Sequence, residues 1–90
     1  MSALEMNAWL KCSIQPGMLP GEYAVETETV SNGTISLFAS EDKLRLSENL
    51  MRVQNLHDSN GRGVLVRLPP QPFEISSQNV RVPQANLVNK

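Results

Sequence analysis

Short runs of alternating apolar and polar residues, separated by closely spaced turn sequences, constrain the fold of this chain more than any other feature. The run at 8–14 shows the pattern most clearly, and its apolar members are Ala8, Leu10, Cys12 and Ile14. The residues between them are Trp9, Lys11 and Ser13. Alternation with a period of two is typical of a half-buried β-strand, because successive side chains of a strand point to opposite faces. Several such runs in a short chain predict an all-β domain.

The segment 22–39 predicts a β-hairpin. Its first strand, over 22–30, has an inward face made of Tyr23, Val25, Thr27 and Thr29. A turn at Ser31-Asn32-Gly33 follows, and Asn-Gly adopts the positive φ values that tight hairpin turns require. The partner strand covers 34–39 and directs Ile35 and Leu37 inward.

Residues 40–53 fit two structures. Ser40-Glu41-Asp42 is typical of a helix N-terminus, and apolar residues continue at helical spacing. The stretch 50–57 also alternates as a strand does. We favour a short helical turn near 41–46 and a strand over 50–57, because the turn sequence 58–61 prefers a strand on each side and a second strand follows at 64–68.

Prolines and polar turns divide the remainder of the chain into short elements. Proline cannot donate a hydrogen bond to a strand ladder, and glycine favours turns. The predicted elements are a loop over 15–21, short strands over 73–75 and 80–82, and a helical turn within 84–88 that packs Leu87 inward.

The composition supports one folded domain. The 90 residues are 40% apolar and carry a net charge of −1, whereas disordered chains are less apolar and more highly charged. We predict a single domain over 1–90, with a flexible N-terminus at 1–7 and a tail at 89–90. The predicted architecture is a five- to seven-stranded antiparallel β-barrel with one or two short helical turns, because closure removes exposed strand edges. Its predicted core is Ala8, Leu10, Cys12, Ile14, Val25, Ile35, Leu37, Val64, Val66 and Leu68.

The C-terminal third resembles the end of Src-homology-3-like barrels. The residues that carry the resemblance are Val80, Val82 and Pro83, followed by one helical turn and the closing pair Leu87-Val88. The hairpin at 50–57 and 62–68 then corresponds to that family's central hairpin. The resemblance implies the barrel fold. It does not imply polyproline binding, because the clustered aromatic groove of the peptide-binding members is absent from this sequence.

Several classes of chemistry lack the residues they need. The single Cys12 excludes an intramolecular disulfide and a cysteine-rich zinc cluster. His57 lies next to Asp58, but adjacent strand residues face opposite ways and make a poor catalytic pair. We therefore predict no enzyme activity, no catalytic residue, no metal and no cofactor, and we infer no small-molecule substrate. Without a signal peptide, a membrane span or disulfides, we expect a cytoplasmic protein that does not bind membranes.

The charges are divided unevenly along the chain. Residues 1–44 hold six acidic residues and two lysines, a net charge of −4, whereas residues 45–90 hold six basic and three acidic residues, a net charge of +3. Two solvated faces of one barrel explain this distribution most simply. The alternative is an anion-binding face, and its candidate residues are Arg52, Arg67, Arg62 and Arg81. Nucleic acid is the partner which that face would suit.

The leading functional hypothesis is a non-catalytic protein–protein binding or assembly module, whose partner can be a second copy of the chain. Its candidate contact residues are Trp9, Met18 and Leu19. The last two are apolar residues in a loop that should be exposed, and exposed apolar loop tips often mark contacts. A lone tryptophan in a small barrel can instead be a core plug or a lid. A nucleic-acid-binding barrel is the alternative function.

Overall fold

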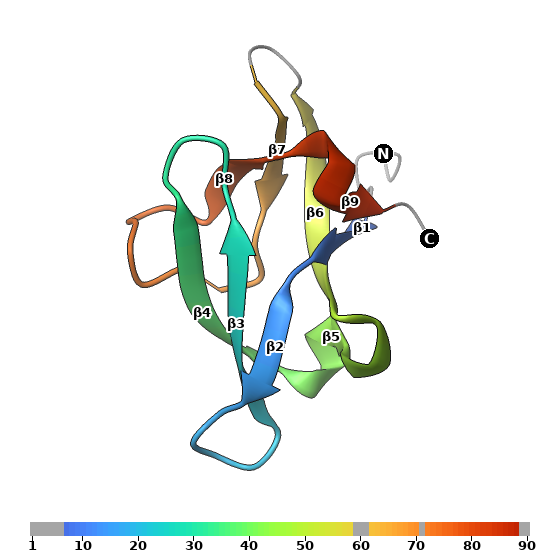
Figure 1. Cartoon of the computed structure of the whole chain (residues 1–90), viewed down its shortest axis with the longest axis vertical. Helices are drawn as coiled ribbons and strands as arrows, with labels where there is room; N and C mark the ends of the chain where they lie inside the picture. The colour runs from blue at the N-terminus through green and yellow to red at the C-terminus, as the bar shows by residue number, and fades with distance from the viewer. Residues whose placement is uncertain (1–6, 59–61, 71, 89–90) are drawn as a thin grey trace.

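The computed structural model describes residues 7–58, 62–70 and 72–88, and these ranges are built from antiparallel strands (Figure 1). The strands are β1 (Asn7–Lys11), β2 (Ser13–Pro16), β3 (Glu22–Glu28), β4 (Thr34–Ser40), β5 (Leu44–Arg45), β6 (Leu50–Asp58), β7 (Val64–Arg67), β8 (Asn79–Val82) and β9 (Leu87–Val88). The described ranges contain no α-helix, and their helical structure consists of the 3₁₀ turns η2 (Glu41–Lys43), η3 (Leu46–Glu48) and η4 (Gln84–Asn86). The all-β class is therefore confirmed.

The strands form two sheets. Sheet A has the order β8-β7-β6-β1-β9, with β5 also paired to β6, and sheet B has the order β2-β3-β4. The hydrogen bonds between the described strands do not close these sheets into one barrel. Loop contacts join them instead. The Val30 N–H donates to the Arg81 carbonyl at 2.9 Å, and the Phe73 N–H donates to the Ser36 carbonyl at 2.9 Å.

The predicted strand at 8–14 is divided at Cys12. β1 pairs with β6 and β9 in sheet A, whereas β2 pairs with β3 in sheet B. Between them, the Cys12 N–H donates at 3.1 Å to the carbonyl of Asn49, just after η3, and not to a strand ladder. The chain passes from sheet A to sheet B at this single residue, and inward and outward side chains continue to alternate from β1 into β2. β1 begins at Asn7, the last residue of the predicted flexible N-terminus. Residues 1–6 and 89–90 lie outside the described residues.

The core lies between the two sheets. Eight of the ten predicted core residues are buried, and the other two, Cys12 and Ile14, are half-buried and pack against the cluster. The sequence analysis missed several further members. They are Ala39, Leu44, Met51, Val53, Val80 and Val82. Four of these six residues are inward residues of β6 and β8, two strands that the sequence analysis predicted without assigning their side chains to the core.

The β3–β4 hairpin is confirmed, but its turn differs from the predicted one. Asn49 is the only non-glycine residue with a positive φ in the described ranges, so Asn32 does not take part in a tight Asn-Gly turn. The Thr29 N–H donates to the Gly33 carbonyl at 2.9 Å, and Gly33 has a φ of 68°. The Thr29 hydroxyl donates to the same carbonyl at 2.7 Å and accepts the Asn32 N–H at 2.9 Å. A buried threonine side chain therefore closes a wider turn.

The segment from 40 to 58 follows the favoured interpretation. The helical turn expected near 41–46 occurs as η2 and η3, which are separated by the two residues of β5, and the strand predicted over 50–57 is β6. The predicted turn at 58–61 falls largely outside the described residues. Val64 and Val66 lie in β7 as predicted.

The predicted strand at 73–75 is wrong. These residues form bends in a loop whose backbone and side chains bond to the edge of β4. The strand β8 and the helical turn η4 agree with the prediction, but Leu87 and Val88 form the strand β9, which was not predicted and which pairs with β1. Leu87 is half-buried against the core, as expected.

Candidate functional site

The loop between β2 and β3 projects from one end of the molecule (Figure 1). At its tip the Met18 side chain is 89% exposed and the Leu19 side chain is 64% exposed. The loop backbone is held in place because the Gly17 N–H donates to the Glu22 carbonyl at 2.7 Å and the Glu22 N–H donates to the Leu19 carbonyl at 3.1 Å. The prediction that these two apolar side chains are exposed is confirmed.

Trp9 lies on the outer face of sheet A and is half-buried, so it is neither a core plug nor a freely exposed ring. The Arg45 guanidinium covers its ring at 4.4 Å from the centroid. Arg45 also forms an ion pair with Glu48 at 3.5 Å. β1 lies on the far side of β2 from the loop that carries Met18, well away from the end of the molecule where this loop projects (Figure 1). The three predicted contact residues therefore do not form one surface.

Three of the four candidate arginines share the outer face of sheet A. In the strand register, Trp9 lies opposite Arg52, Gln54 opposite Arg67, and Leu65 opposite Arg81, so all these side chains point away from the core. The Arg52 and Arg67 side chains are exposed, whereas Arg81 is half-buried. Arg62, the fourth candidate, is exposed just before β7.

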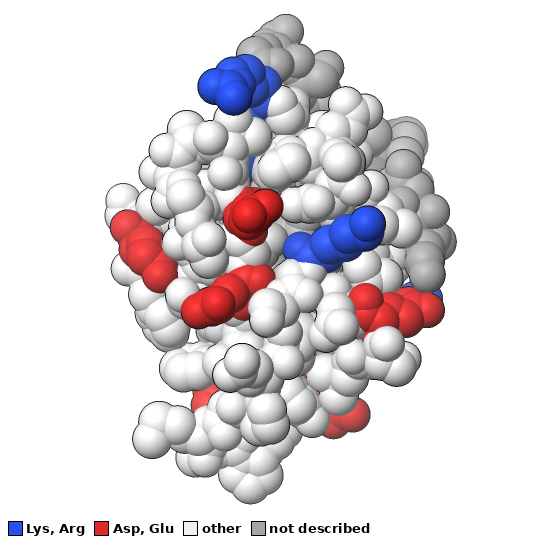
Figure 2. Space-filling view, in the orientation of Figure 1, with Lys and Arg blue, Asp and Glu red and all other residues white. Residues whose placement is uncertain are grey.

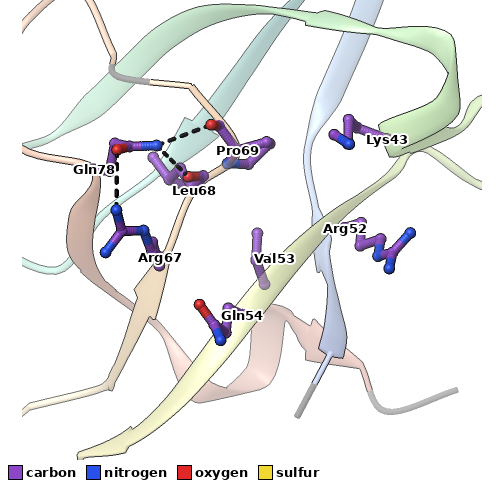
Figure 3. A pocket seen from close by; sticks show the side chains of 8 residues that line it. All are labelled: Lys43, Arg52, Val53, Gln54, Arg67, Leu68, Pro69 and Gln78. Atoms are coloured by element: carbon purple, nitrogen blue, oxygen red, sulfur yellow. Dashed lines mark hydrogen bonds between the residues drawn. The ribbon is translucent and has the colours of Figure 1, made fainter. Parts of the chain in front are cut away.

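A pocket of about 260 Å³ opens between β6, β7 and η2 (Figure 3). The polar residues that line it are Lys43, Arg52, Gln54, Arg67 and Gln78, and Val53, Leu68 and Pro69 supply apolar surface. Figure 3 shows Arg67 and Gln78 on one side of the pocket and Lys43 and Arg52 on the other. Among the described residues that line it there is no carboxylate, so the lining has a positive charge.

Gln78 organises one side of this pocket. Its side-chain amide nitrogen donates to the Leu68 carbonyl at 3.0 Å and to the Pro69 carbonyl at 2.9 Å, and its side-chain oxygen accepts from the Arg67 guanidinium at 3.4 Å. Its backbone carbonyl accepts the Leu68 N–H at 2.8 Å. These bonds hold the loop after β7 against the start of β8. They also leave the Gln78 side-chain oxygen directed toward Arg67. Sequence reasoning missed Lys43, Gln54 and Gln78, because no local pattern shows that the pocket brings them together.

A second hollow of about 200 Å³ adjoins the first, since Lys43 and Pro69 line both. Phe38 and Pro70 form its apolar part. The Phe38 ring contacts the Phe73 ring edge to face, with 5.2 Å between the centroids. Both rings are partly exposed, at 37% and 64%. An apolar surface thus continues from the positively charged pocket.

Acidic side chains gather on the other sheet. Figure 2 shows several of them over the middle of sheet B and others toward the edges of this face, with basic side chains over β1 and near the far end of the β6–β7 hairpin. Glu26 and Glu28 are exposed on β3 and point outward. The Glu74 carboxylate accepts the Ser36 N–H at 2.7 Å, and this hydrogen bond lowers the pKa of Glu74. Acidic and basic side chains therefore lie together on this face of the molecule.

The side chains of His57 and Asp58, which the sequence analysis considered as a pair, lie outside those that the structure describes. Burial raises the pKa of the Cys12 thiol to about 11, which disfavours the nucleophilic thiolate. No group of three or more histidine, cysteine, aspartate or glutamate side chains is placed to hold a metal ion in the described part of the chain. The candidate sites are thus the exposed loop tip and the positively charged pocket.

Comparisons with protein-family models, curated proteins and solved structures find no match to this chain. Within residues 7–58, 62–70 and 72–88, no helix has the length and apolar character that crossing a membrane requires.

Proposed function

We propose that this chain is a non-catalytic binding or assembly module that acts through protein contacts, and that its two sheets are a Src-homology-3-like barrel in topology. The barrel interpretation is supported by the order of the last elements, in which the β6–β7 hairpin is followed by β8, η4 and a final strand that pairs with β1. A cytoplasmic location belongs to the same proposal. It is supported by the single free cysteine, because small secreted domains commonly depend on disulfides.

The exposed apolar tip of the β2–β3 loop carries the functional proposal. Fully burying a leucine or methionine side chain stabilises a complex by roughly 1.5–3 kcal/mol. Met18 is 89% exposed and Leu19 is 64% exposed, so most of their apolar surface is in contact with water. Two hydrogen bonds already order the loop backbone. A partner that covers the tip therefore gains apolar burial without a large ordering cost. Trp9, which lies elsewhere, is a second and separate contact candidate.

The test is the double variant Met18→Asp/Leu19→Asp. We expect it to reduce binding to a partner, or self-association, by at least about tenfold while the melting temperature changes by less than about 2 °C, since the changed side chains lie outside the core. Pull-down with quantitative mass spectrometry measures the first effect, and sedimentation velocity measures self-association. The control, Ser31→Asp/Ser47→Asp, adds the same charge at two exposed positions.

The outcomes separate the possibilities. Loss of binding in the loop variant alone supports the proposal. Equal capture and equal sedimentation of the wild type and both variants contradict it. If the loop variant unfolds, the tip belongs to the core and the proposal also fails.

A nucleic-acid-binding function is the second candidate, and the shared outward face of Arg52, Arg67 and Arg81 favours it. Such binding releases counterions, so its affinity must fall steeply as salt is added. Titration of labelled single-stranded RNA and DNA at about 50 mM salt tests it. Flat titrations at that salt concentration eliminate this function.

A further inference from the structure

We propose that the pocket between β6, β7 and η2 is a binding site for the terminal phosphate of a small phosphorylated ligand. Arg52, Arg67 and Lys43 would be its cationic contacts. The site goes beyond the protein-binding function, because it lies on sheet A and uses neither Met18 nor Leu19. Its argument rests on charge, orientation and the shape of the surrounding surface.

The pocket lining carries three cationic side chains and no carboxylate among the described residues. Arg52 and Arg67 come from neighbouring strands, at diagonal positions of the register, where side chains lie about 7–8 Å apart at their bases. Neither guanidinium forms an ion pair with a described residue. Lys43 brings a third cation from η2. Arg52, Arg67 and Lys43 line one pocket, and guanidinium groups without a carboxylate partner are a usual means of binding phosphate.

A hydrogen bond to Gln78 holds the Arg67 side chain in place before any ligand binds. Its guanidinium donates to the Gln78 side-chain oxygen at 3.4 Å, and Gln78 is itself fixed by two backbone carbonyls. Part of the entropy of ordering this arginine is therefore lost on folding and not on binding. Gln78 is a positioning residue, because its side-chain nitrogen is already bonded to the Leu68 and Pro69 carbonyls and its side-chain oxygen to Arg67.

The geometry favours a phosphate over a carboxylate. The cations lie on opposite sides of the pocket, with Arg67 on one side and Lys43 and Arg52 on the other (Figure 3). A terminal phosphate carries close to two negative charges and presents three acceptor oxygens in different directions. A carboxylate presents two oxygens in one plane. Cations that line one pocket also suit a single multiply charged group better than the evenly spaced charges of a nucleic-acid backbone.

The surroundings strengthen the site and leave space for the rest of a ligand. Val53, Leu68 and Pro69 supply the apolar part of the lining. The adjoining hollow at Phe38 and Pro70 offers an apolar surface next to the phosphate position. One competing anion is present, because the Lys43 ammonium pairs with the Asp42 carboxylate at 3.3 Å. The Lys43 and Asp42 side chains are 43% and 69% exposed, so water screens this ion pair and a ligand can replace it.

The experiment is a titration of the full chain with pyrophosphate, followed by ¹H–¹⁵N NMR at constant ionic strength. We expect saturable shifts centred on the amides of Arg52, Gln54, Arg67 and Gln78. Arg52→Gln and Arg67→Gln should each weaken binding by about tenfold or more, the effect of removing one hydrogen bond to a charged group. Arg62→Gln removes the same charge from an exposed position outside the pocket, and it should change the affinity by less than about twofold.

A gain-of-binding variant tests the same idea in the other direction. Asp42→Asn removes the anion that competes for Lys43, so it should tighten pyrophosphate binding by about twofold to fivefold. Glu28→Gln changes the net charge equally from the other sheet and should have a smaller effect.

Three results would overturn the proposal. They are shifts that do not saturate, equal weakening by Arg62→Gln and the two pocket variants, and binding of a dT10 oligonucleotide without terminal phosphates in preference to pyrophosphate. The loop variant Met18→Asp/Leu19→Asp should keep its pyrophosphate affinity. A failure of the phosphate site therefore leaves the protein-contact proposal standing, and the reverse also holds.

Discussion

Replacing Gly63 with alanine should destabilise the domain much more than the same change at Gly33, although both glycines have a positive φ. Gly63 has a φ of 74°, and a Cβ atom built on it would lie 2.4 Å from the Val82 carbonyl oxygen and 2.6 Å from Cγ2 of Val30. At Gly33, where φ is 68°, no atom of the described residues lies within 4 Å of such a Cβ. The pair therefore separates backbone strain from steric conflict.

The expected magnitudes follow from these contacts. A left-handed conformation costs an L-residue roughly 1–2 kcal/mol, and the smaller entropy of the unfolded alanine chain returns about 0.4–1 kcal/mol. Gly33→Ala should thus cost about 1 kcal/mol. At Gly63 the conflicting carbonyl belongs to β8, where Val82 pairs with Val64 and the neighbouring Arg81 carbonyl accepts the Val30 N–H. The backbone cannot retreat without loss of these bonds, and overpacking costs about 1–3 kcal/mol, so Gly63→Ala should cost about 3 kcal/mol.

Urea and thermal unfolding followed by the fluorescence of Trp9, the single tryptophan, measure both costs. A loss of about 3 kcal/mol is a large part of the roughly 5–13 kcal/mol expected for a chain of this length. It should lower the melting temperature by roughly 10–20 °C for Gly63→Ala, against about 5 °C for Gly33→Ala. If the two variants agree within about 0.5 kcal/mol, the steric contact between Gly63 and β8 does not constrain the fold and the reasoning is refuted.

Two further predictions concern titratable groups. Because burial raises the pKa of the Cys12 thiol to about 11 from its ordinary value near 9, alkylation by iodoacetamide at pH 8 should be about 100-fold slower in the folded chain than in urea; equal rates would contradict this burial. The hydrogen bond from the Ser36 N–H lowers the pKa of Glu74 below its ordinary value. The contact between this loop and β4 therefore stabilises the fold at pH values above the ordinary pKa, and this stabilisation is lost as the pH falls through the lowered pKa. The Ser36 amide resonance should therefore titrate at low pH in the wild type and lose this titration in Glu74→Gln, and a Ser36 shift that does not change with pH would exclude the bond.

Local pattern predicted most of the strands, because burial of alternate side chains is written into a period of two. The runs at 8–14, 22–30 and 64–68 place Leu10, Val25 and Val66 in the core, where all three have no exposed surface. The exposure of Met18 and Leu19 was predictable for a similar reason, since proline and glycine confine them to a loop.

Contacts between distant segments explain the errors. Residues 73–75 have the composition of a strand, but Phe73 and Glu74 bond to Ser36, which lies more than 35 positions earlier. Cys12 interrupts an otherwise regular strand because its N–H donates a hydrogen bond to the Asn49 carbonyl and not to a neighbouring strand. Neither partner is visible in the local sequence, and in each case the distant hydrogen bond outweighs the local strand preference.

The positively charged pocket shows the same division most clearly. Periodicity alone places Arg52 and Arg67 on the outward side of their strands, and this outcome needs no knowledge of the fold beyond strand geometry. Their meeting with Lys43 and Gln78 depends on the β6–β7 register, on the position of η2, and on a loop that brings Gln78 back to the Leu68 and Pro69 carbonyls. Side-chain direction is a local property of the backbone. Proximity between residues of different elements is set by the packing of the whole chain.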